Sequence, residues 1–137
     1  MRIEPNLNDK PQSASLLQIV EPSEVNRRMS SGNTFVVNVV ATWCPDCTQR
    51  QKLYTDSFAK KMGAHKIEVL QVDVQLTKGV FISPEHEQMT ALFGGHGYPR
   101  TVLINHGNVA SQDNVEIIAE DTLSELASKF IQIISES

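Results

Sequence analysis

An apolar run over residues 34–41, followed at once by two cysteines, is the feature that most constrains the fold. Between its ends the run reads Phe-Val-Val-Asn-Val-Val, which is rich in β-branched residues and almost continuously apolar. Such runs are typical of strands that are covered on both faces of a sheet. Residues 48–62 then predict a helix with Leu53, Phe58 and Met62 on or near one face. The cysteines are therefore expected at a junction between a buried strand and a helix.

Strands and helices are predicted to alternate on both sides of this junction. In chain order, the further elements are a strand at 15–20, a helix at 22–29, a strand at 66–74, a helix at 84–93, a strand at 101–105, a returning strand within 109–119, and a helix that begins with the capping-box pattern Thr122-Leu123-Ser124-Glu125. Residues 75–82 are expected to be irregular. The order β-α-β-α-β-α-β-β-α predicts an α/β fold with a central mixed sheet flanked by helices.

The length of 137 residues fits one domain. Residues 1–14 are polar and contain two prolines, so we expect a loosely ordered N-terminal arm before a domain over residues 15–137. A composition of 40% hydrophobic and 20% charged residues is typical of a packed globular chain and too apolar for a disordered one.

The charge balance and the chain start limit the expected partners and location. A formal net charge of -4 does not favour binding to nucleic acid or to an anionic membrane. No apolar run approaches the roughly 20 residues that cross a bilayer. We expect a cytoplasmic monomer, or a periplasmic or secreted protein if a signal peptide was removed.

Cys44 and Cys47 are the candidate reactive residues. Two cysteines three positions apart in the first turn of a helix lie on one side of it, so their sulfurs can form a disulfide. The first cysteine faces the unpaired N–H groups of the helix start, which stabilise a thiolate, so Cys44 is the expected nucleophile. Cys47 would then resolve the mixed disulfide that Cys44 forms with a substrate.

The neighbouring residues are expected to tune this pair. Pro45 fixes its own φ angle at the helix start, and the carboxylate of Asp46, if it lies close to Cys44, opposes the charge of the thiolate. We therefore predict moderate acidity for Cys44 and a couple that acts as a reductant. Trp43 is expected to pack beside the cysteines and shield them.

Two other interpretations of the cysteines are open. Half of a zinc site would need two histidines among His65, His86, His96 and His106, but no second Cys-x-x-Cys or closely spaced histidine pair is present. The cysteines could also be inert, because free cysteine is often a small buried hydrophobic residue. We expect no metal.

Two segments give the sequence a family resemblance. Residues 39–47, Val-Val-Ala-Thr-Trp-Cys-Pro-Asp-Cys, and residues 97–104, Gly-Tyr-Pro-Arg-Thr-Val-Leu-Ile, resemble the active-site junction and the cis-proline loop of the thioredoxin superfamily. The resemblance covers roughly residues 15–134 and implies a single-domain thioredoxin-like fold. It implies a cis peptide bond before Pro99, which would place the backbone of Tyr98 opposite Cys44 to bind substrate. The alternative for Tyr98 is a half-exposed aromatic residue that packs on its own loop.

Three features depart from this family. Asn38 occupies the place of a buried acid thought to assist the resolving thiol. Either this amide alters the catalytic step, or Asn38 is a hydrogen-bonded interior residue without a catalytic role. Arg100 adds a cation that favours acidic substrates or is simply solvated. The segment 75–97 is longer than usual, and its His96 either stabilises the Cys44 thiolate or is solvated.

The expected function is a thiol-disulfide oxidoreductase that needs no cofactor beyond its own Cys44–Cys47 disulfide. Its partners would be a disulfide-containing protein or small molecule and an upstream thiol reductant or oxidant. The alternative is a thioredoxin-like adapter or maturation chaperone that binds a client protein without redox turnover. A dithiol metal carrier is disfavoured because no additional soft ligand is visible.

Overall fold

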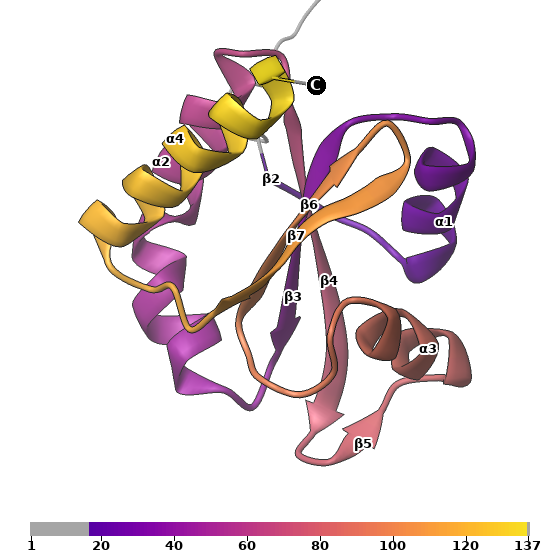
Figure 1. Cartoon of the computed structure of the whole chain (residues 1–137). Helices are drawn as coiled ribbons and strands as arrows, with labels where there is room; N and C mark the ends of the chain where they lie inside the picture. The colour runs from indigo at the N-terminus through magenta and orange to yellow at the C-terminus, as the bar shows by residue number, and fades with distance from the viewer. Residues whose placement is uncertain (1–16, 137) are drawn as a thin grey trace, which may run out of the picture.

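A mixed sheet with the strand order β2-β4-β3-β6-β7 forms the centre of the computed structural model, which describes residues 17–136 (Figure 1). The strands are β2 (Leu17–Ile19), β3 (Phe35–Ala41), β4 (Glu68–Thr77), β5 (Val80–Phe81), β6 (Arg100–Asn105) and β7 (Asn108–Val115). β2, β4 and β3 run parallel, whereas β6 and β7 are antiparallel to their neighbours and β5 pairs antiparallel with β4. The predicted mixed sheet is confirmed, and the predicted arm over residues 1–14 lies outside the described residues.

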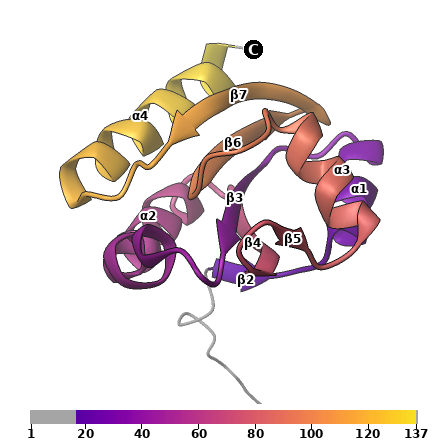
Figure 2. The same cartoon turned by 90° about the horizontal axis from the view of Figure 1, so that it is seen from below.

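The helices cover both faces of this sheet. They are α1 (Pro22–Ser30), α2 (Lys52–Gly63), α3 (Pro84–Leu92) and α4 (Glu120–Glu136), and the π-helical turn η2 (Asp46–Gln51) leads directly into α2. Figure 2 shows α2 and α4 on one face and α1 and α3 on the other. Within residues 17–136, no helix is long and apolar enough to span a membrane.

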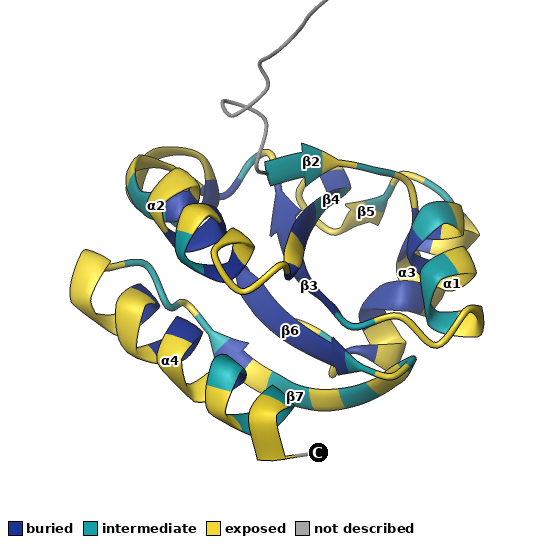
Figure 3. Ribbon diagram, turned by 90° about the horizontal axis from the view of Figure 1, so that it is seen from above, coloured by how far each residue is buried: buried dark blue, intermediate teal, exposed yellow. Residues whose placement is uncertain are grey.

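Two hydrophobic clusters fill the space between the sheet and the helices. Val25 of α1 packs with Val37 of β3 on one face. On the other face, Phe58 of α2 and Phe130 of α4 meet edge to face at 6.4 Å and pack with Val36. All seven residues of β3 are buried, as the dark blue strand in Figure 3 shows. Because successive side chains of a strand point to opposite faces, β3 supplies both clusters, and each buried valine contributes about 1.5–3 kcal/mol.

The predicted order of elements is confirmed, with one addition. The prediction that residues 75–82 are irregular is wrong, because β4 continues to Thr77 and turns back at Gly79 into β5. The side-chain oxygen of Gln75 accepts the Gly79 N–H at 3.0 Å, and Gly79 has a positive φ of 83°. A buried polar side chain thus holds this hairpin, and a search for apolar alternation misses it.

Two helix starts also differ from the prediction. The helical segment after the cysteines begins at Asp46, and the expectation for Leu53 is wrong because its side chain is 71% exposed. α4 begins at Glu120, so the predicted capping box at Thr122 lies inside the first turn. There the Thr122 hydroxyl donates to the carbonyl of Ala119 at 3.1 Å.

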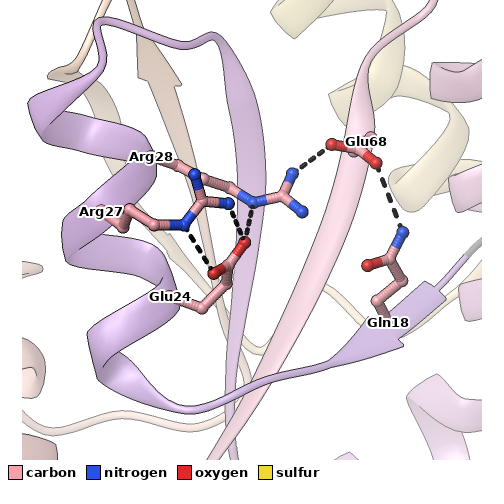
Figure 4. Close-up of polar contacts among 5 residues, drawn as sticks. All are labelled: Gln18, Glu24, Arg27, Arg28 and Glu68. Carbon is pink, nitrogen blue, oxygen red and sulfur yellow. Dashed lines mark hydrogen bonds and ion pairs between the residues drawn. The ribbon is translucent and has the colours of Figure 1, made fainter.

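A charged cluster ties α1 to the sheet (Figure 4). The guanidinium of Arg28 bonds Glu24 on its own helix at 2.7 Å and also Glu68 at the start of β4. Arg27 bonds Glu24 as well, and Gln18 of β2 donates to Glu68 at 3.3 Å. The two guanidinium groups, Arg27 first and then Arg28, lower the pKa of Glu24 to about 2. Glu24 is therefore charged at neutral pH and holds Arg28, whose second bond to Glu68 links α1 to β4.

Candidate functional site

The two cysteines lie at the predicted junction, where β3 passes into the helical segment. Cys44 donates its N–H to the carbonyl of Ala41 at 3.1 Å, and Cys47 donates to the carbonyl of Cys44 at 3.1 Å. Pro45 lies within this tight backbone turn, and its φ of -63° is already helical. Both thiols are free and each residue is only 6% exposed. The junction thus presents two close thiols at the end of the most buried strand.

Cys44 lines a cleft of about 530 Å³, which we call the Cys44 cleft. Trp43, Pro45, Asp46, Lys78, Tyr98 and Glu116 are among its other lining residues. Trp43 donates its ring N–H to the side-chain oxygen of Gln75 at 3.0 Å, and its ring meets that of Tyr98 edge to face at 6.0 Å. The ammonium of Lys78 lies 5.3 Å from the centre of the Trp43 ring. These contacts hold Trp43 as a wall beside Cys44.

The loop before β6 faces Cys44 across this cleft. The peptide bond between Tyr98 and Pro99 is cis, and the Cys44 thiol donates to the carbonyl of Tyr98 at 3.7 Å. The Tyr98 side chain is buried instead of half-exposed, and among the described residues its hydroxyl has no hydrogen-bond partner. The backbone of Tyr98 therefore lies where a chain bound at Cys44 would meet it, and contact with substrate stays a prediction.

Cys47 has a different environment from Cys44. Burial raises the pKa of the Cys47 thiol, and the nearby Cys44 and Asp46 raise it further. A separate pocket of about 320 Å³, the Cys47 pocket, is lined by Cys47 and lies between η2, α2, β2, the end of β3 and the middle of β4. Its lining includes Asp56 and Asp73. The two thiols thus open toward two different cavities, and Cys47 keeps its proton at neutral pH.

Asp46 forms an ion pair with Arg50, one helical turn further on. This partner partly neutralises the carboxylate, while the remaining charge acts on Cys47, whose pKa it helps to raise. The expected effect of Asp46 on the acidity of Cys44 stays a prediction.

Asn38 belongs to a buried polar network that joins three elements. Its amide donates to the side-chain oxygen of Gln51 at 2.8 Å, and its oxygen accepts the Thr101 hydroxyl at 3.2 Å. Gln51 in turn donates to the carbonyl of Ile117 at 3.0 Å. Asn38 is therefore a hydrogen-bonded interior residue, and a catalytic contribution stays a prediction. Sequence reasoning missed Gln51, whose signal is its place one turn after Cys47.

Arg100 is buried, so the interpretation that it is solvated is wrong, while a preference for acidic substrates stays a prediction. It is 6% exposed, and its guanidinium donates to the carbonyl of His96 at 2.7 Å and to that of Gln112 at 2.8 Å. A Cβ atom at Gly94 would lie 2.5 Å from this guanidinium, so glycine leaves the space that it fills. Arg100 therefore clamps the loop that carries Tyr98 to β7. His96 itself is exposed at the rim of the Cys44 cleft.

Potential metal ligands are scattered. Over residues 17–136, no three His, Cys, Asp or Glu side chains cluster as a metal site would require. His86 is buried, and its ring nitrogen lies 2.7 Å from the hydroxyl of Ser83, which caps α3. The zinc interpretation of the cysteines therefore has no supporting ligand group in the described part of the chain.

Comparison with known proteins gives a structural answer only. The sequence matches no family model and no curated protein. A mutant thioredoxin from Halobacterium salinarum superposes with a TM-score of 0.61 at 20% identity, covering 83% of this chain and 89% of that chain. Thioredoxin from Plasmodium falciparum gives 0.62 at 20% identity, covering 83% and 97%. The first thioredoxin domain of mouse protein disulfide-isomerase A4 gives 0.63 at 16% identity, covering 85% and 74%. These likenesses, together with the mixed sheet covered by helices on both faces, show that the chain has the thioredoxin fold.

Proposed function

We propose that the protein is a thiol-disulfide oxidoreductase that reduces disulfides of proteins or small molecules. The observation that carries the proposal is the asymmetry of its two thiols. Both residues are equally buried, but Cys44 lines the larger cleft and faces the carbonyl of Tyr98, whereas Cys47, one turn away, lines the smaller Cys47 pocket and has a raised pKa. A nucleophile needs access, and a resolving thiol needs to stay protonated until the nucleophile has reacted.

The reaction has two exchange steps. The Cys44 thiolate attacks one sulfur of the substrate disulfide, breaks the S–S bond, and forms a mixed disulfide while the other substrate sulfur leaves and takes up a proton. Cys47 then loses its proton and attacks the Cys44 sulfur. This step releases the second substrate thiol and leaves a Cys44–Cys47 disulfide. Two electrons have passed to the substrate, and an upstream thiol reductant must restore the two thiols.

The proton of Cys47 needs an acceptor in the second step. Asn38 cannot take it, because an amide is not a base in this pH range and both of its polar atoms are already bonded. The Cys47 pocket offers a route to water past Asp56 and Asp73, which are among its lining residues. We therefore expect resolution to be the pH-dependent step.

The direction of electron flow is part of the proposal. The carboxylate of Asp46 lies in the motif and its charge disfavours the Cys47 thiolate, which supports a reducing couple. A reductant of this kind fits the cytoplasm, where thiols are kept reduced.

Trapping tests the proposal directly. The Cys47→Ser variant should accumulate mixed disulfides on Cys44 with proteins of a cell extract, and the double variant Cys44→Ser/Cys47→Ser should capture none. The reduced wild type should also reduce hydroxyethyl disulfide. If Cys44 alkylates no faster than an unstructured thiol and the wild type leaves this disulfide intact, the adapter function replaces the enzyme.

A further inference from the structure

A second cavity adjoins the Cys44 cleft. This β5–α3 groove has a volume of about 690 Å³ and lies between the β4–β5 hairpin and α3, which are neighbours in Figure 1. Its lining includes Val80, Phe81, Ile82, Pro84, Glu87 and Ala91. Gly79 and His96 line both cavities, so the groove continues directly from the cleft that holds Cys44.

The groove has the character of a peptide-binding surface. Val80 is 59% exposed and Ile82 is 45% exposed, so two aliphatic side chains face solvent within one short segment. The volume falls within the roughly 300–1,000 Å³ of pockets that bind organic ligands. Backbone glycines border it, and a Cβ atom at Gly79 or Gly95 would meet nothing within 4 Å. The border between the cleft and the groove is therefore open at Gly79, which lines both cavities.

The charge of the groove selects among peptides. Glu87 is its acidic lining residue, and no lysine or arginine of the described chain lines it. A basic side chain can approach this carboxylate, whereas an acidic one is repelled.

We propose that the β5–α3 groove binds the polypeptide segment next to the substrate disulfide, with an aliphatic side chain on Val80 and Ile82 and a basic side chain facing Glu87. This inference rests on the proposed function, because the position of Cys44 sets where the disulfide must lie. It names the substrate as a protein or peptide with an apolar and basic residue beside its cysteine. Small disulfides fill the Cys44 cleft alone and gain nothing from the groove.

Three disulfide probes test the selectivity. The first is a synthetic peptide disulfide with Leu and Lys beside its cysteine, the second is its analogue with Ser and Gln, and the third is hydroxyethyl disulfide. We expect kcat/KM to be about tenfold higher for the first peptide than for its analogue, because partial burial of one leucine is sufficient for that factor. Val80→Asp should abolish this preference, and Glu87→Lys should lower it several-fold. Neither variant should change the reduction of hydroxyethyl disulfide.

Matched controls keep the result specific. Leu53→Asp places the same charge on an exposed aliphatic position of α2, and Glu125→Lys makes the same charge reversal on α4, so both should leave the peptide preference unchanged. Calorimetry with a peptide whose cysteine is replaced by serine measures groove binding without turnover, and Val80→Asp should weaken that binding about tenfold.

The outcomes separate the two proposals. If the wild type leaves hydroxyethyl disulfide intact, the proposed function fails, and the calorimetric result alone decides on the groove. If the two peptides are reduced equally, or if Val80→Asp slows all three disulfides alike, the groove is not a substrate-binding surface and the inference is overturned.

Discussion

Replacement of Arg100 by methionine is the most informative single perturbation of the site. Its guanidinium is buried and bonds the carbonyls of His96 and Gln112, which belong to the loop before β6 and to β7. This loop carries Tyr98, whose carbonyl lies 3.7 Å from the Cys44 sulfur. The variant therefore tests whether a residue outside the cysteine motif positions the reactive thiol.

The magnitude follows from the contacts that are lost. Two hydrogen bonds from a charged donor are worth about 1.5–3 kcal/mol each. Part of this loss in stability is offset, because the variant no longer buries a guanidinium whose Nε atom lacks a hydrogen-bond partner among residues 17–136. The ion pair with Asp113 at 3.6 Å adds little, because Asp113 is exposed. We expect Arg100→Met to lower the free energy of unfolding by about 2–4 kcal/mol, which is roughly 8–16 °C in Tm for a chain of this size.

Two measurements check this expectation. Urea denaturation followed by circular dichroism gives the change in stability. The rate of hydroxyethyl disulfide reduction should also fall by about ten- to a hundredfold, because a displaced loop no longer orients its carbonyl toward Cys44. Arg27→Ala is the matched control, because it removes an exposed arginine that pairs on the surface of α1 and should leave the stability nearly unchanged. A loss below about 1 kcal/mol for Arg100→Met, together with full activity, would refute the clamp.

Three further perturbations have defined outcomes. Burial holds the pKa of Cys47 above its ordinary value of about 9, so unfolding of the reduced protein releases a proton above that pH. Urea denaturation should therefore show that the free energy of unfolding falls by up to about 1.4 kcal/mol per pH unit in this range, and Cys47→Ser should lack this component. Asn38→Asp should lower the free energy of unfolding by about 1–3 kcal/mol, because it removes a buried hydrogen-bond donor. It should also speed the resolution of the mixed disulfide in stopped-flow experiments, and an unchanged rate would leave Asn38 with a structural role only. Gly107→Ala should lower stability by at least about 2 kcal/mol, because its Cβ would lie 2.4 Å from the Met29 carbonyl; Gly79→Ala, with the same φ of 83° and open space, should cost less.

The sequence was informative wherever a local pattern decides the structure. A β-branched apolar run predicts a strand covered on both faces, and β3 is such a strand. The spacing of Cys44 and Cys47 after it fixes where the two thiols can lie, because only a few residues of backbone separate them from β3. The final helix, α4, was also predictable from a local pattern, because Leu123, Leu126 and Phe130 recur at helical spacing and are all buried.

The remaining features depend on contacts between distant segments. Nothing in the local pattern around Arg100 shows that the carbonyls of a loop and of β7 will surround its guanidinium. The polar network of Asn38 and Gln51 likewise brings together residues from a strand and a helical turn. Leu53 was misplaced because the π-helical turn before α2 changes the helical phase on which the predicted apolar face depended.

The side-chain oxygen of Gln75 accepts hydrogen bonds from both the Trp43 ring and the backbone of Gly79. One amide therefore couples the wall of the Cys44 cleft to the border of the β5–α3 groove. Trp43 is also the single tryptophan of the chain. Its fluorescence should consequently act as a built-in optical reporter, whose intensity changes when the cysteines are oxidised and when a peptide occupies the groove, so that both events can be followed without a label.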